Sequence, residues 1–215
     1  MKCLLCDEQR VAPLGSYPDK VLGDRSYFKC PACELVFLDP QLRLDKTSEK
    51  TRYDLHRNSL DDPDYLAFLS RLADPFADRL EPNAAGLDYG CGPVPAMASL
   101  MKNKGFEVAS FDPFYFPQEE LLTRPYDFIC CSEAVEHFYD PQKEFDTMFR
   151  CLKPKGLIGI MTNLLTAQIQ FESWWYRKDP THVCFYNYRT FEWVARRYKL
   201  GLEVFDDRIV LLKAD

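Results

Sequence analysis

A glycine-rich stretch bounded by a carboxylate is the first feature of this sequence that could do chemistry. Residues 86–93 read Gly-Leu-Asp-Tyr-Gly-Cys-Gly-Pro, with Asp88 at the end of a short apolar run and Gly90 and Gly92 behind it. Glycine is needed where φ is positive or where a Cβ would collide with a ligand. A phosphate ligand would be repelled by Asp88, whereas a ligand with an ammonium or sulfonium group would be attracted. The stretch therefore predicts a site for a positively charged, nucleotide-like ligand.

The three histidines are the candidate bases, because histidine is the usual group with a pKa near neutrality. His137 follows the apolar run 126–131, and His182 lies in an aromatic-rich loop beside Asp179, which could orient it. His56 is the weakest candidate. For His137, a structural role, with the ring bonded to backbone at a helix start, is as good an interpretation as a catalytic one. For His182, the surrounding aromatic residues could simply pack the loop onto the domain.

Glu133 and Glu136 are the carboxylates nearest to His137 in the sequence. They could act as a catalytic pair. Both also lie near a helix start, where the helix dipole stabilises a carboxylate, and this alone would explain the presence of either residue. Two of the histidines with a carboxylate could also bind a metal ion, although nothing in the spacing favours such a site.

Two Cys-x-x-Cys pairs near the N-terminus predict a structural zinc site. Cys3 and Cys6 are separated from Cys30 and Cys33 by a spacer that is slightly longer than the usual zinc pattern, and an extra hairpin would accommodate it. A closed four-cysteine site leaves no open position for chemistry. A redox dithiol at either pair is the alternative. The remaining cysteines are scattered through apolar segments, which is typical of buried side chains in a reducing compartment.

The elements that must position these residues form three parts: a zinc ribbon over 1–40, a linker and N-terminal helical cap over 41–82, and a Rossmann-like domain over 83–215. A helix is expected from Asp62 onward, kinked or split at Pro75. Further along, strands alternate with helices, which predicts a mostly parallel sheet covered on both faces, closed by a hairpin that contributes an antiparallel strand. The expected strands are 85–89, 106–111, 126–131, 157–161, 202–205 and 208–212, and the expected helices are 95–104, 141–152 and 190–198.

Composition limits the class of protein. The chain has 215 residues, 47% of them hydrophobic, and a net charge of −6. Its acidic balance makes a nucleic-acid partner unlikely, since phosphate contacts need a basic face. No apolar run has membrane-spanning length, and the N-terminus has no signal-peptide core. We therefore expect a cytoplasmic protein without a membrane partner.

Four segments, in order, give the sequence a resemblance to the class I S-adenosylmethionine-dependent methyltransferases. Residues 87–92 resemble the glycine loop that holds the methionine part of the cofactor, and Asp112 resembles the acid that binds both ribose hydroxyls. Residues 126–137 are similar to the fourth-strand segment, and residues 152–157 to the approach to the fifth strand. The resemblance implies these cofactor contacts: Tyr53, Asp88, Tyr89, Gly90, Cys91, Gly92, Asp112, Pro113, Phe114, Ser132 and Glu133.

The sequence departs from the family pattern in two places. Val94 stands where the family commonly has a third glycine, so the loop should be stiffer and more crowded. Only residues 113–125 separate Asp112 from the next strand, too few for the usual helix, third strand and second helix. The third-strand region is therefore expected to be shortened, with adenine contacts from Pro113, Phe114 and Tyr115 or from the loop around Leu121.

The expected function is S-adenosylmethionine-dependent methylation of a small-molecule acceptor, with His182 or His137 as the base. The four-cysteine module ahead of such a domain resembles a group of uncharacterised bacterial methyltransferases. The alternatives are an RNA methyltransferase that uses the zinc ribbon to contact RNA, and a non-catalytic cofactor-binding partner protein. The acceptor itself is not specified by the fold.

Overall fold

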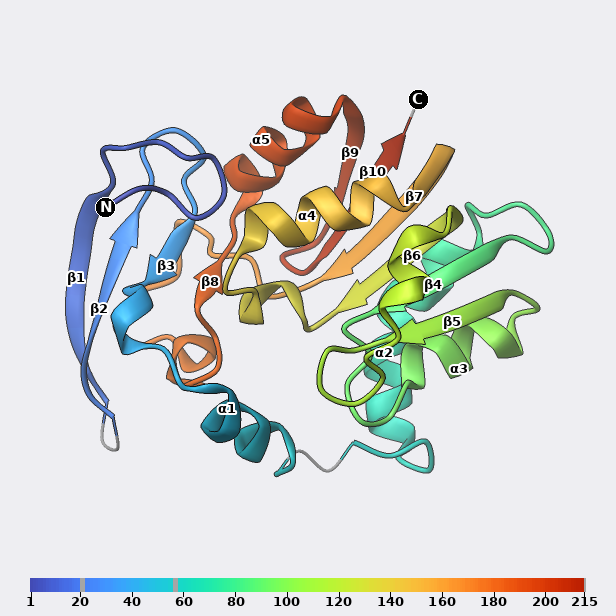
Figure 1. The fold of residues 1–215 in the computed structure, drawn as a ribbon, viewed down its shortest axis with the longest axis horizontal. Helices are drawn as coiled ribbons and strands as arrows, with labels where there is room; N and C mark the ends of the chain where they lie inside the picture. The colour runs from blue at the N-terminus through green and yellow to red at the C-terminus, as the bar shows by residue number, and fades with distance from the viewer. Residues whose placement is uncertain (20–21, 56–57, 215) are drawn as a thin grey trace.

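The computed structural model describes residues 1–19, 22–55 and 58–214, and its centre is a six-stranded sheet with the order β5-β4-β6-β7-β10-β9 (Figure 1). The strands are β4 (Ala85–Tyr89), β5 (Glu107–Phe111), β6 (Tyr126–Ser132), β7 (Leu152–Met161), β9 (Leu200–Phe205) and β10 (Ile209–Ala214). β4 pairs in parallel with β5 and β6, and β6 pairs in parallel with β7. β10 is antiparallel to both β7 and β9, so the expected α/β sheet with a terminal antiparallel hairpin is confirmed.

The third-strand region is shortened, as expected. Between β5 and β6 the chain makes an isolated bridge from Asp112 to Phe116 and a short 3-10 helix, η2 (Glu119–Thr123). β5 is consequently the edge of the sheet.

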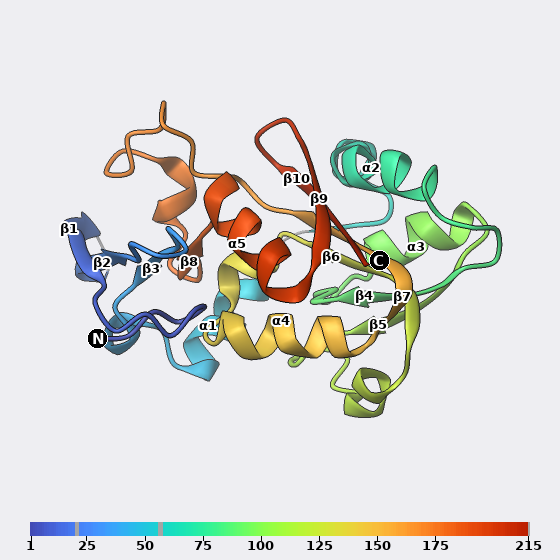
Figure 2. The ribbon, with the colours of Figure 1, turned by 90° about the horizontal axis from the view of Figure 1, so that it is seen from above.

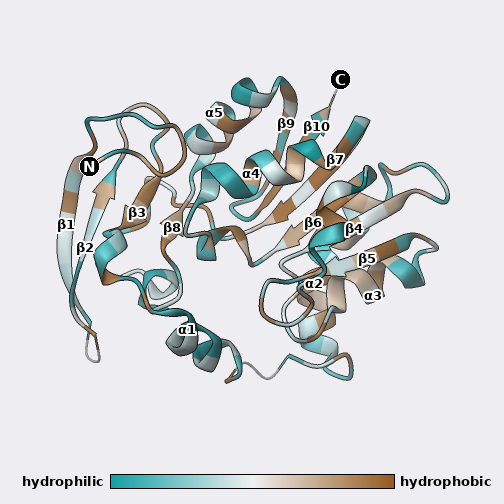
Figure 3. Ribbon diagram, viewed as in Figure 1, coloured by the Kyte–Doolittle hydropathy of each residue, from teal (hydrophilic) through white to brown (hydrophobic). Residues whose placement is uncertain are grey.

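Helices cover both faces of the sheet (Figure 2). α2 (Pro63–Ala77) and α3 (Ala96–Asn103) pack on one face, and α4 (Pro141–Arg150) and α5 (Tyr188–Tyr198) on the other. Successive side chains of β6 alternate between the two cores: Phe128 and Cys130 belong to the core with α2 and α3, whereas Ile129 and Cys131 belong to the core with α4 and α5. Such a strand is apolar where both of its faces are covered, as Figure 3 shows by the brown segments within β6 and β7.

Two local expectations are corrected. α2 is not split at Pro75: the proline removes only the hydrogen bond that residue 75 would donate, and the helix ends soon after it, at Ala77. The expected linker contains a helix, α1 (Lys46–Tyr53), whose N-cap Asp45 accepts from the backbone N–H of Ser48 at 2.9 Å.

The N-terminal module forms a second sheet. β1 (Ala12–Asp19) and β2 (Gly23–Lys29) make the hairpin that the long cysteine spacer was expected to accommodate, and β3 (Val36–Leu38) follows. The fourth strand, β8 (Cys184–Phe185), comes from the loop before α5 and pairs with β3. The module is thus tied directly to the C-terminal third of the chain.

The four N-terminal cysteines converge at one end of this second sheet. Their sulfur atoms all lie within 4.8 Å of one another. Sγ of Cys3 is 3.5 Å from Sγ of Cys33, and Sγ of Cys6 is 3.4 Å from Sγ of Cys30, so each close contact joins one pair to the other. Among the described residues, no helix has the length and apolar character needed to cross a membrane.

Candidate functional site

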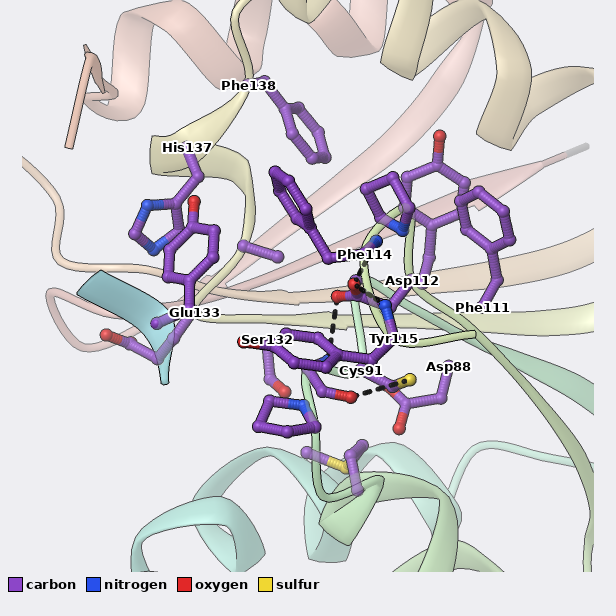
Figure 4. A pocket seen from close by; sticks show the side chains of 18 of the residues that line it. Asp88, Cys91, Phe111, Asp112, Phe114, Tyr115, Ser132, Glu133, His137 and Phe138 are labelled. Atoms are coloured by element: carbon purple, nitrogen blue, oxygen red, sulfur yellow. Dashed lines mark hydrogen bonds between the residues drawn. The ribbon is translucent and has the colours of Figure 1, made fainter. Parts of the chain in front are cut away.

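A cavity of about 690 Å³ opens at the carboxyl ends of β4, β5 and β6, where open α/β sheets place their ligands (Figure 4). It is lined by every residue that the sequence singled out for cofactor or catalysis: Tyr53, Asp88, Tyr89, Gly90, Cys91, Gly92, Asp112, Pro113, Phe114, Ser132, Glu133, His137 and His182. The structure therefore brings all of these candidates together, apart from His56, which lies outside the described residues.

The two loop glycines have different reasons to be glycine. Both have positive φ, 77° at Gly90 and 64° at Gly92. A Cβ on Gly90 would lie 2.7 Å from the Cβ of Ala134, whereas a Cβ on Gly92 would meet no atom within 4 Å. Gly90 is therefore required by packing, and Gly92 leaves an open backbone surface that a ligand can approach.

Asp88 is a buried carboxylate, and one of its two oxygens has no hydrogen-bond partner among the described residues. It is 1% exposed, and its Oδ2 accepts from the backbone N–H of Ala98 at 3.0 Å. Oδ1 is the oxygen without a partner in the described part of the chain. Burial raises the pKa of Asp88 to about 7. A cationic group in the cavity would stabilise the ionised carboxylate.

Asp112 already holds the loop in shape. Its Oδ2 accepts from the backbone N–H of Gly92 at 3.0 Å, and its Oδ1 accepts from those of Phe114 and Tyr115 at 2.8 and 3.1 Å. Each carboxylate oxygen has two acceptor positions, so Oδ1 is filled by these two N–H groups, whereas Oδ2 can still accept from a hydroxyl of a ribose.

The loop turns without a third glycine. Val94 lines the cavity, and its carbonyl accepts from the N–H of Ala96 at 2.7 Å, ahead of the first turn of α3. Within the loop, positive φ is confined to Gly90 and Gly92. The glycine commonly found at the Val94 position is therefore not needed for this backbone path.

α1, which sequence patterns did not reveal, closes one side of the cavity. Tyr53 donates to the buried carboxylate of Glu49 at 2.8 Å, and its ring packs edge-on against Phe114, with centroids 5.7 Å apart. Tyr115 donates to Asp54, just beyond α1, at 2.6 Å. These contacts join the cap to the turn after β5.

Glu133 and Glu136 form an acidic pair in which Glu136 is fully buried and the side chain of Glu133 is 30% exposed. Glu136 accepts from the hydroxyls of Tyr176 at 2.5 Å and Thr162 at 3.0 Å. The Tyr176 hydroxyl is also 3.4 Å from Oε2 of Glu133, and Arg208 lies 3.6 Å from Oε1. Burial, together with the neighbouring Glu136, raises the pKa of Glu133 to about 8; burial raises that of Glu136 to about 7.

His137 and His182 are adjacent, with ring centroids 4.7 Å apart. Nδ1 of His137 is 3.1 Å from the carbonyl oxygen of Thr181, and Nδ1 of His182 is 2.7 Å from that of Tyr176. A carbonyl can only accept, so each Nδ1 carries the hydrogen and each neutral ring has its lone pair on Nε2. Burial lowers the pKa of His137, which favours that neutral form.

The second sheet supports the His182 segment. Arg25 on β2 is 1% exposed and donates to the carbonyls of Asp179 and Pro180 at 3.4 and 2.9 Å. The carboxylate of Asp179 accepts from Arg52 and from Thr181, and these hydrogen bonds hold its pKa well below the ordinary value despite burial. Sequence reasoning missed Arg25, because an arginine on a polar strand carries no local sign of burial.

Comparison with known proteins agrees with the geometry. Residues 58–204 match the family described as "Methyltransferase domain". No curated protein matches the chain. Among solved structures, the chain is similar to the PH0226 protein from Pyrococcus horikoshii, with a TM-score of 0.55 and 12% identity over 78% of this chain and 99% of that one.

Two further structures share the fold. An O-methyltransferase family protein from Burkholderia thailandensis has a TM-score of 0.53 and 10% identity over 77% of this chain and 62% of that one. Human N-acetylserotonin methyltransferase, solved with S-adenosylmethionine, has a TM-score of 0.52 and 10% identity over 78% of this chain and 57% of that one. This chain thus spans about three fifths of the length of either protein. The fold is that of S-adenosylmethionine-dependent methyltransferases, and the chain belongs to the methyltransferase domain family.

Proposed function

We propose that this protein is an S-adenosylmethionine-dependent methyltransferase that acts on a small-molecule acceptor. The observation that carries the proposal is the buried carboxylate of Asp88, one oxygen of which has no hydrogen-bond partner among the described residues, beside the open backbone of Gly92. A positively charged cofactor fits both features, since its ammonium group can neutralise Asp88 while its chain passes over the glycine.

The residues that would hold the cofactor line one part of the cavity. The loop 88–92 would bind the methionine portion, Asp112 the ribose hydroxyls, and Pro113 and Phe114 the adenine side; Tyr53, Ser132 and Glu133 would complete the enclosure. When bound, S-adenosylmethionine supplies a methyl group activated by its sulfonium.

The acceptor would lie against His137 and His182. Both side chains line the same cavity as the cofactor loop, and in their neutral form both have the lone pair on Nε2. An acceptor oxygen, nitrogen or carbon acid would lose its proton to one of these atoms. His182 is the stronger candidate, because Arg25 and β8 fix the loop that carries it.

We also propose that Cys3, Cys6, Cys30 and Cys33 bind a structural zinc ion. Four sulfur atoms from two turns, within 4.8 Å of one another, match the donor set of a tetrahedral zinc site. The abundance of cysteines outside disulfides supports a reducing, cytoplasmic location. Elemental analysis of the purified protein, expected to give one zinc per chain, tests the site; Cys151→Ser serves as a control that should retain the zinc.

Calorimetric titration with S-adenosylmethionine tests the enzyme proposal at its first step. Saturable binding is expected, and its absence up to millimolar concentration contradicts the proposal. Transfer of a radiolabelled methyl group to metabolite extracts then identifies the acceptor fraction. In His182→Ala, turnover should fall by at least tenfold while cofactor affinity stays within a factor of two.

A further inference from the structure

A group of metal-ligating side chains lies in the acceptor part of the cavity. Glu136 and His137 come from the 3-10 turn η3 (Val135–His137) after β6, and His182 comes from the loop before β8. One ligand atom from each of the three residues lies within 4.8 Å of the other two. The fold thus assembles from distant segments a donor set that spacing in the sequence did not favour.

Each of these three side chains is held by hydrogen bonds of the kind that orient metal ligands in proteins. Both imidazoles have Nδ1 held by a backbone carbonyl, which makes Nε2 the ligand atom of each. The carboxylate of Glu136 is fixed by the hydroxyls of Tyr176 and Thr162. Hydrogen bonds of this kind, from the second ring nitrogen and to the carboxylate, characterise metal-binding histidines and acids in proteins.

Glu133 places a second carboxylate beside this group of three ligands. It approaches the Tyr176 hydroxyl that Glu136 also uses, and its Oε1 is buried without a hydrogen-bond partner among the described residues. Arg208, at 3.6 Å, is the cation that the structure places next to this pair. Figure 4 shows Glu133 and His137 on the side of the cavity away from Asp88. The charges of the two carboxylates repel each other, and a divalent cation bound to Glu136 would offset that repulsion.

We propose that Glu136, His137 and His182 bind one divalent metal ion. One carboxylate and two imidazoles suit Mn²⁺ or Fe²⁺ in six-coordinate geometry. Three protein ligands leave three positions, two of which fit an acceptor with two neighbouring oxygen atoms, such as a vicinal diol or a catechol. A coordinated hydroxyl releases its proton to solvent and remains bound as the oxyanion nucleophile.

The inference rests on the proposed methyltransferase function and gives the histidines a different part in it. As metal ligands they use the Nε2 lone pairs that a base would need, so the two roles exclude each other. The acceptor class also narrows, because a metal ion of this type activates an oxygen acid rather than a carbon acid.

Binding of Mn²⁺ to the full chain, with zinc left in the cysteine site, tests the inference. Electron paramagnetic resonance of free Mn²⁺ should show one saturable site, and pulsed spectra of the bound ion should show coupling to imidazole nitrogen. His182→Ala and Glu136→Gln should each weaken Mn²⁺ binding at least tenfold. Glu144→Gln alters a carboxylate of the same cavity that bonds to Tyr89 instead, and it should keep the wild-type affinity.

The outcomes separate this inference from the proposed function. If no saturable site is found, or if the histidine and glutamate variants bind Mn²⁺ like the wild type, the metal site is wrong. If His182→Ala does not fold, as judged by its thermal melt, His137→Asn takes its place with the same expected loss. S-adenosylmethionine is titrated in parallel into the same protein without added Mn²⁺. Cofactor binding without Mn²⁺ binding overturns the metal site alone, and Mn²⁺ binding without cofactor binding overturns the methyltransferase proposal.

Discussion

The carboxylate of Asp112 accepts a hydrogen bond from the backbone N–H of Gly92 at 3.0 Å. The acid that ends β5 therefore holds the loop that follows β4, and the two neighbouring strands form one half of the site together. A ligand bound to Asp112 would meet a glycine loop that is already in place.

Asp112→Asn should weaken S-adenosylmethionine binding by about 10- to 100-fold. The amide oxygen can replace only one of the two carboxylate oxygens as an acceptor, and hydrogen bonds to a charged group contribute about 1.5–3 kcal/mol. Calorimetric titration measures the change, with the exposed Glu120→Gln as a control of equal charge change. Unaltered affinity in Asp112→Asn would show that the ribose contacts another group.

Alanine at the two loop glycines should separate folding from binding. Gly90→Ala forces a Cβ to within 2.7 Å of Ala134 at a positive φ and should lower the unfolding free energy by more than 2 kcal/mol. Gly92→Ala meets no atom and should cost only about 1–2 kcal/mol for its positive φ.

Binding should respond in a different way. The Gly92→Ala methyl group projects into the space that the cofactor is expected to occupy, so affinity should drop at least tenfold in a protein that remains folded. Denaturant unfolding and calorimetric titration of both variants check the pair. Wild-type affinity in Gly92→Ala would mean that the cofactor chain takes another path.

The stability of the ligand-free protein should fall as the pH rises from about 4 to 7, because of Asp88. Its folded-state pKa, about 7, lies above the ordinary 3.8, so the folded protein retains a proton that the unfolded chain has released. The contribution is fully present below pH 4 and is lost as the pH passes the folded pKa. The change is on the order of 2–4 kcal/mol for a shift of this size.

Asp88→Asn isolates this effect, since the amide oxygen can still accept from Ala98 and cannot ionise. Denaturant unfolding of both proteins at pH 5 and pH 8 should show a steeper loss in the wild type. Saturating S-adenosylmethionine should reduce the difference, because the ammonium group favours the ionised carboxylate. Parallel pH profiles for the two proteins would assign the dependence to other groups.

The parts of the fold that follow from local patterns could be predicted from the sequence. β4 and Asp112 are examples, because an apolar run that ends in a carboxylate and a glycine turn specifies its own geometry. α1 was missed because its residues are polar and it is held by contacts to the turn after β5. β8 is two residues long and exists through its pairing with β3, which no local pattern encodes.

In the candidate site, too, local patterns predict some features, whereas others depend on contacts between distant segments. Glu133, Glu136 and His137 are close in the sequence, so their proximity was readable, but the arrival of His182 beside them depends on a long loop. The hydroxyls of Tyr176 and Thr162 that fix Glu136 come from separate segments. Long-range packing therefore decides whether this group acts as base, acid pair or metal site.

Arg25→Met should loosen the His182 loop while leaving the cofactor loop intact. The change removes the donors to the partly buried carbonyls of Asp179 and Pro180, and among the described residues only that of Asp179 keeps another hydrogen bond, from the N–H of His182; we expect a cost of about 1 kcal/mol. Limited proteolysis within residues 163–187 should become faster, and S-adenosylmethionine affinity should stay within a factor of two.

Arg10→Met, the same replacement at an exposed arginine of the N-terminal module, should change neither the rate of proteolysis nor the affinity. Arg25→Lys should restore part of the protection, since an ammonium group can still donate to a carbonyl. Equal proteolysis of Arg25→Met and the wild type would show that β8 pairing alone positions His182.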